Sequence, residues 1–140
     1  MECVLRVHGQ AFDVDRFLAD SPWRANPVYH RGEKRVRLRG SEFQECSGFV
    51  LSVPGSDTFG EAFIDEVSAV MKFLEQNHSE CERLKAFPGI EERTLDFAVP
   101  FRDDQPMRSH HIPLELVRAA ADLGIALEIT VYAVSEEIKS

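Results

Sequence analysis

The sequence is poor in the features that mark secreted and membrane proteins. Its 140 residues include only three cysteines, Cys3, Cys46 and Cys81, and no two of them form a CxxC pair. An odd number of scattered cysteines is more typical of a reduced protein than of a disulfide framework. No apolar run approaches the roughly 20 residues of a membrane-spanning helix. The first residues, with Glu2 and Arg6, lack the apolar block of a signal peptide. We therefore expect a cytoplasmic protein without a membrane partner.

Positive charge is also scarce. The chain has 16 Lys and Arg against 24 Asp and Glu, so the formal net charge is −8. Binding to phosphate backbones relies on clustered Lys and Arg, so we expect no nucleic-acid partner. A basic protein partner is compatible with this charge, although acidity is also an ordinary route to solubility. Length and composition fit a single domain over residues 1–140, with 135–140 expected to fray.

Motifs with a known chemical mechanism are missing. The sequence has no Gly-rich phosphate loop, no Gly-x-Ser-x-Gly elbow and no His-Glu-x-x-His pair. The spacing His78-x-x-Cys81 supplies one pair of zinc ligands at best, and a buried apolar role is more typical of scattered cysteines. We therefore predict no catalytic residue, no metal and no cofactor.

Apolar and polar residues alternate with a period of two in several segments, which predicts strands with one buried face. The apolar faces include Cys3, Leu5 and Val7 near the start and Leu127, Ile129 and Val131 near the end. The expected strands are 2–8, 35–39, 49–53, 94–99 and 127–132.

Four segments have the spacing or the capping residues of helices, namely 13–18, 58–77, 79–85 and 113–123. Residues 21–32, with two prolines, are expected to form an ordered loop that Trp23 anchors on the core. With the two middle helices taken together, the order is β-α-β-β-α-β-α-β. It predicts a two-layer α+β fold with a ferredoxin-like β-α-β-β-α-β core and an extra C-terminal α-β. The sheet should be rich in antiparallel pairs and carry its helices on one face.

Three stretches carry a resemblance: VLRVHGQAFDVDRFL (4–18), SPWRANPVYHRGE (21–33) and IPLELVRAAADLGIALEITVYAV (112–134). In these the chain resembles the bacterial domain-of-unknown-function family 4279. The resemblance spans nearly the whole chain, although 40–101 matches only in pattern. It implies a small cytoplasmic bacterial protein of uncharacterised activity, and it assigns no catalytic residue.

The strongest candidate for a functional surface is the polar side of the predicted sheet. Strand alternation places the candidate binding residues Arg6, Arg35, Arg37, Arg39, Glu128 and Tyr132 there, together with Glu2, His8, Thr94, Asp96 and Thr130. Three arginines on one strand face repel each other and need carboxylates or an outside partner to offset that repulsion. Such a face predicts docking of a protein, or else an ordinary solvated surface with weak ion pairs.

The leading hypothesis is a non-enzymatic protein-binding module, for example an immunity or antitoxin-like protein that binds a basic toxin. A small-molecule or anion-binding protein that uses the arginine-rich face is the first alternative, because an arginine fork grips carboxylate and phosphate. The second alternative is an enzyme with His110 or His111 as acid and base, near Asp103 and Asp104. A homodimer through the open sheet face or an edge is a further partner that the sequence leaves open.

Overall fold

The chain forms one mixed sheet in a computed structural model, which describes residues 2–35, 43–57, 63–101, 104 and 107–133. The strands are β1 (Cys3–Gly9), β2 (Val28–Tyr29), β3 (Ser47–Ser52), β4 (Glu92–Phe101) and β5 (Ala126–Ala133), in the spatial order β2-β3-β1-β4-β5. Neighbouring strands are antiparallel, except that β4 and β5 are parallel. The predicted α+β class is thus confirmed.

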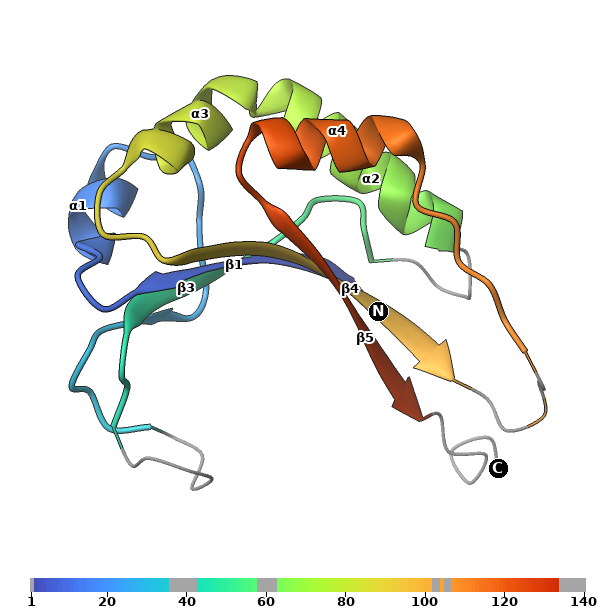
Figure 1. The fold of residues 1–140 in the computed structure, drawn as a ribbon. Coiled ribbons are helices and arrows are strands. Elements are labelled where there is room, and N and C mark those ends of the chain that lie inside the picture. Colours follow the sequence, from blue (N-terminus) through green and yellow to red (C-terminus); the bar gives the residue numbers. More distant parts are fainter. Residues whose placement is uncertain (1, 36–42, 58–62, 102–103, 105–106, 134–140) are drawn as a thin grey trace.

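Four helices occur among the described residues: α1 (Val14–Ala19), α2 (Phe63–Gln76), α3 (His78–Ala86) and α4 (Leu114–Asp122). All of them lie on the same side of the sheet (Figure 1). The sheet bends away from them, so its other face forms the inner side of an arch (Figure 1). No helix within the described ranges is long and apolar enough to cross a membrane.

The ferredoxin-like arrangement is not confirmed. The five-stranded mixed sheet does contain the expected extra C-terminal strand, because β5 runs parallel to β4 at one edge. This pair is parallel because the helical crossover through α4 returns the chain in the same direction along the sheet.

The second strand lies in the segment that was expected to be an ordered loop. Val28 and Tyr29 pair with Phe49 and Gly48 of β3, and two residues are too short to leave an alternating pattern in the sequence. Most of the expected strand 35–39 lies outside the described residues, as do the start of the long helix at 58–62 and the tail at 135–140.

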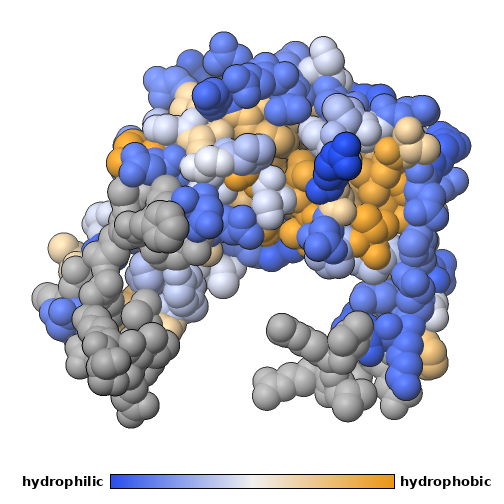
Figure 2. All heavy atoms as spheres, turned by 180° about the vertical axis from the view of Figure 1, so that it is seen from behind, coloured by the Kyte–Doolittle hydropathy of each residue, from blue (hydrophilic) through white to orange (hydrophobic). Residues whose placement is uncertain are grey.

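The core lies between the sheet and the helices, and the predicted apolar faces of β1, β3 and β4 point into it. Phe17 of α1 stacks on Phe49 of β3, with ring centroids 5.9 Å apart and planes 9° from parallel. Trp23 is buried beside them, and its Nε1 donates to Oδ1 of Asn77 at 3.1 Å. The anchoring role that was predicted for Trp23 is confirmed. Figure 2 shows the apolar residues as a band beneath a hydrophilic outer layer.

The last strand departs from its prediction. Leu127 is half-buried, but Ile129 is 38% exposed and Val131 is 59% exposed on the side that faces the helices. Among the described residues β5 is the edge strand, so no strand of that part of the chain pairs with its outer side. The alternating pattern correctly predicted the strand, but a pattern within one strand carries no information about what covers it.

Candidate functional site

The centre of the helix-free face holds a charged cluster. Arg6 of β1 places Nη1 2.5 Å from Oδ2 of Asp96 on β4, and its Nη2 donates to Glu128 on β5. The Oγ1 of Thr130 donates to Oδ1 of Asp96 at 2.7 Å. The register explains the cluster, because Asp96 lies opposite Glu128 and residues two apart on a strand share a face. The sequence pattern had placed all four residues on this face.

The guanidinium in this cluster is held in its charged form. Burial lowers the pKa of Arg6, but the hydrogen bonds and charges of Glu128 and Asp96 outweigh burial and raise it. Two carboxylates thus neutralise one cation, which leaves the cluster with one net negative charge. Asp96 lies beneath its partners and is only 7% exposed. Its neighbour Thr94 is 3% exposed, so the prediction that both face water was wrong, because side chains of adjacent strands cover them.

A second pair continues the same face along β1 and β4. Nε2 of His8 lies 2.9 Å from Oε2 of Glu92, and Oγ1 of Thr94 donates to Oε1 of Glu92 at 3.0 Å. Glu92 was not among the residues that the sequence placed on this face. Its place two residues before Thr94 was the signal that could have found it.

The three arginines of the predicted basic strand are not shown as a cluster. Arg37 and Arg39 lie outside the described residues, and Arg35 is half-buried in a loop. Nε of Arg35 is buried and has no hydrogen-bond partner in the described part of the chain. The arginine-rich character of this surface therefore stays a prediction.

Two tyrosines border the charged cluster. A Cβ on Gly48 would lie 2.3 Å from the backbone oxygen of Val7 and 2.6 Å from the hydroxyl of Tyr29, so only glycine fits at this position. Burial raises the pKa of Tyr29. Tyr29 was missed because it lies in the segment that was expected to be a loop. Tyr132, a predicted site residue, is on β5 and partly exposed.

We call this surface the open face. Its carboxylates come from Glu2, Glu92, Asp96 and Glu128, against the permanent cation of Arg6 and the histidine His8. Glu2 accepts a hydrogen bond from Oγ of Ser52 at 3.3 Å, on the same side of the sheet. Counted with Arg35, whose charge acts on Tyr29, the described residues of this surface carry four carboxylates against two arginines and His8, an excess of negative charge.

The histidine pair does not have the arrangement of an acid–base centre. The His110 ring packs on Phe63, with centroids 4.9 Å apart, and burial and the charge of Arg108 lower its pKa. His111 is exposed. Within the part of this loop that the structure describes, 104 and 107–111, neither imidazole is hydrogen-bonded to a carboxylate. Asp103 lies outside it.

No group of three metal-ligating side chains forms among the described residues. The two residues of the spacing His78-x-x-Cys81 differ in environment: Cys81 is fully buried, whereas Nε2 of the exposed His78 lies 3.6 Å from Oε1 of Glu82. Burial raises the pKa of the Cys81 thiol to about 11, which disfavours the thiolate that a metal needs.

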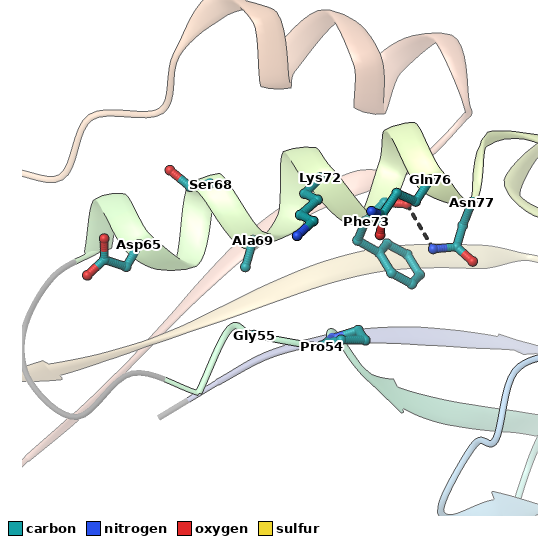
Figure 3. Close-up of a pocket in the computed structure, with 9 residues that line it drawn as sticks. All are labelled: Pro54, Gly55, Asp65, Ser68, Ala69, Lys72, Phe73, Gln76 and Asn77. Carbon is teal, nitrogen blue, oxygen red and sulfur yellow. Dashed lines mark hydrogen bonds between the residues drawn. The ribbon is translucent and has the colours of Figure 1, made fainter.

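A pocket of about 440 Å³ lies between α2 and the turn after β3 (Figure 3). Pro54 and Gly55 form one wall, and Ala69, Lys72, Phe73 and Gln76 of α2 form the other. Lys72 and Gln76 are exposed, so its polar groups stay solvated. The ionisable residues of its lining are Asp65 and Lys72, which lie seven positions apart on α2, roughly 10 Å along the helix axis. They do not converge as the groups of an active site do.

Comparison of the chain with protein-family models, with curated proteins and with solved structures finds no match. No function is therefore carried over from a relative, and the resemblance to family 4279 stays an expectation. The geometry of the open face is what supports a function.

Proposed function

We propose that this protein is a non-enzymatic binding module whose open face holds a basic segment of another protein. The observation that carries the proposal is the cluster of carboxylates around Arg6 on a curved sheet face that no helix of the described chain covers. A surface with an excess of one charge sign attracts and orients a partner of the opposite sign. An immunity or antitoxin-like protein that binds a basic toxin is one biological form of such a module.

A cationic partner fits this face better than an anion does. The guanidinium of Arg6 is already shared between two carboxylates, and an incoming anion has to displace one of them. The carboxylates themselves are more accessible, since the side chains of Glu92 and Glu128 are 53% and 49% exposed. Each keeps oxygen lone pairs free for an incoming Lys or Arg.

An incoming cation can replace Arg6 as the partner of Glu128 at a small cost in free energy. Exposed ion pairs contribute at most about 1 kcal/mol, so Glu128 can turn from Arg6 toward an incoming guanidinium at little cost. Asp96 is the more buried carboxylate and keeps Arg6 in place during the exchange. Tyr132 lies four residues further along β5, roughly 13 Å from Glu128. It is partly exposed, so it adds an aromatic face for another cation of the same segment.

The test uses a fluorescein-labelled nona-arginine peptide and fluorescence anisotropy. The variant Glu92→Gln/Glu128→Gln removes two charges from the open face, and the control Glu75→Gln/Glu82→Gln removes two from exposed positions on α2 and α3. Both variants change the net charge equally. We expect the open-face variant to weaken binding by about fivefold or more, a loss of about 1 kcal/mol, and the control by less than twofold.

Equal weakening by both variants would show that only net charge attracts the peptide, and it would contradict the proposal. No measurable binding by the unmodified protein would contradict it as well. A nona-glutamate peptide is the matched opposite probe. If that peptide binds more tightly than nona-arginine, the face takes anions and the anion-binding alternative replaces the proposal.

A further inference from the structure

The outer edge of β5 lacks the features that prevent an edge strand from pairing with a strand of another chain. β5 is eight residues long and contains no proline, no glycine, no lysine and no arginine. Edge strands of soluble proteins are ordinarily short, bulged or charged, because their free N–H and C=O groups otherwise pair with another strand. The single charge of β5 is Glu128, and Arg6 of the same chain already binds it. By its composition, β5 is therefore suited to pair with another strand.

Apolar side chains follow the same edge on the helix side. Ile129 and Val131 are both exposed, although the equivalent residues of the neighbouring β4, Phe97 and Val99, are buried. On α4, which packs against β5, Leu114 and Val117 are exposed as well. Apolar groups gather where the sheet stops, and another layer of protein at this edge would remove them from water.

We propose that β5 pairs antiparallel with β5 of a second copy of this chain, across a two-fold axis that passes beside Thr130. In an antiparallel pair that is symmetric about Thr130, each residue lies opposite the residue of the other copy that is equally far from Thr130 in the other direction. Ile129 then lies opposite Val131 of the other copy, and Glu128 lies opposite Tyr132. Residues directly opposed share a face, so the helix side gains two apolar pairs and the open side gains two carboxylate–phenol pairs.

This strand complements itself, which favours a second copy over an unrelated partner. The two-fold axis forms each contact twice, as in isologous interfaces. It also keeps the two Glu128 carboxylates out of direct opposition, which matters between chains of net charge −8 each. The opposite edge is a poorer candidate, because β2 is only two residues long.

The dimer joins two five-stranded sheets into one. A two-fold axis perpendicular to the sheet leaves both helical layers on one side and both open faces on the other. The α4 helices then approach each other with Leu114 and Val117 near the new boundary. This inference does not depend on the proposed function, because the pairing rests on the backbone and the apolar side of β5, although Glu128 and Tyr132 belong to both surfaces.

Sedimentation velocity of the full chain from about 1 to about 200 µM, a range that resolves micromolar dimers, is the first test. We expect a dimer that dissociates on dilution. Val131→Arg should reduce dimerisation by about tenfold or more, because two arginines would then face apolar side chains. The control Ile64→Arg, at an exposed apolar position on α2, should leave it unchanged. A monomer throughout, or a dimer that survives Val131→Arg, overturns the proposal.

Disulfide trapping tests the register. In a Cys46→Ser background, which removes the more accessible native thiol, single cysteines replace Ile129, Thr130 and Val131 in turn. Only Thr130→Cys brings two cysteines face to face, since the others lie two positions apart along the partner, beyond the roughly 7 Å limit between Cα atoms. We expect rapid dimer cross-linking for Thr130→Cys alone. Fastest cross-linking at another position overturns this register.

Discussion

Arg6 and Asp96 lie on neighbouring strands and form an ion pair on the open face, with Nη1 2.5 Å from Oδ2. The two residues contribute differently, because the Asp96 side chain is 9% exposed and that of Arg6 is 38% exposed. Without Arg6, the mostly buried carboxylate of Asp96 would have no cation beside it and would keep only the hydroxyl of Thr130 as a partner. The same guanidinium presents Glu128 to solvent, so one arginine both stabilises the sheet and orients the surface proposed to bind a partner.

We expect Arg6→Ala to lower the free energy of unfolding by about 1–3 kcal/mol. The loss leaves Asp96 with Thr130 but without a cation, and it is smaller than for a fully buried pair because Arg6 is partly solvated. Glu128→Ala removes only an exposed partner and should cost less than about 1 kcal/mol. Urea denaturation of both variants measures the difference, and an Arg6→Ala loss no larger than that of Glu128→Ala would contradict the assignment.

We expect the free energy of unfolding to depend on pH because of the buried carboxyl group of Glu66. The carboxyl is 3% exposed, its Oε1 has no hydrogen-bond partner among the described residues, and burial raises its pKa to about 7. The folded state therefore holds a proton that the unfolded state releases near pH 4.5. Stability should fall as pH rises from about 4.5 to about 7 and level off above that range, by as much as about 3 kcal/mol from this group.

Glu66→Gln isolates this contribution, because the amide does not titrate. We expect the stability of Glu66→Gln relative to the unmodified protein to increase by about 1–3 kcal/mol between pH 5 and pH 8. Chemical denaturation at both pH values measures it. A difference between the two proteins that stays constant with pH would show that Glu66 is ionised at both.

His30 connects α1 to the loop after β2. Its Nε2 lies 2.9 Å from Oδ2 of Asp15 and its Nδ1 lies 2.8 Å from Oε1 of Glu33, and these hydrogen bonds raise the pKa of His30. The stabilisation that they give is complete below the unfolded pKa near 6.5 and is lost as pH rises through the higher folded value. Asp15→Asn should lower the His30 pKa in an NMR titration. Asp13→Asn, at the N-cap of α1, is the matched control and should leave it unchanged.

The three cysteines should differ in reactivity. Cys3 and Cys81 are fully buried, whereas Cys46 is half-buried, and burial raises the pKa of each thiol. We expect the native protein to react with one equivalent of a water-soluble disulfide reagent and the unfolded protein with three, because access limits thiolate exchange. Cys46→Ser should abolish the native reaction. Rapid modification of more than one native thiol would contradict the burial of Cys3 and Cys81.

Local patterns predicted much of this structure because they report directly on burial. The alternation of Cys3, Leu5 and Val7 gave the inward face of β1, and the same logic placed Arg6 and Asp96 together on the open face. Such patterns hold wherever one face of a strand is covered and the other is not.

The features that the sequence did not predict depend on neighbours that are distant in the chain. β2 exists because Val28 and Tyr29 meet β3, and two residues have no period of their own. Ile129 and Val131 follow the inward pattern yet remain exposed, because edge position is a property of the whole sheet. Asp96 was expected in water but is buried, because Arg6 and Thr130 on the two neighbouring strands contact it. Each of these differences depends on which residues distant in the sequence pack against the position, and local propensity does not encode that.

An NMR titration of the ¹⁵N-labelled protein with unlabelled nona-arginine tests whether the open face binds a basic protein segment. We expect the largest amide shifts on β1, β4 and β5 around Arg6, Glu92 and Glu128, with little change in α2 and α3. The same shifts should be absent in Glu92→Gln/Glu128→Gln. Largest shifts on the helices, or around the pocket at Lys72, would contradict the account and move the binding surface to the other side of the molecule.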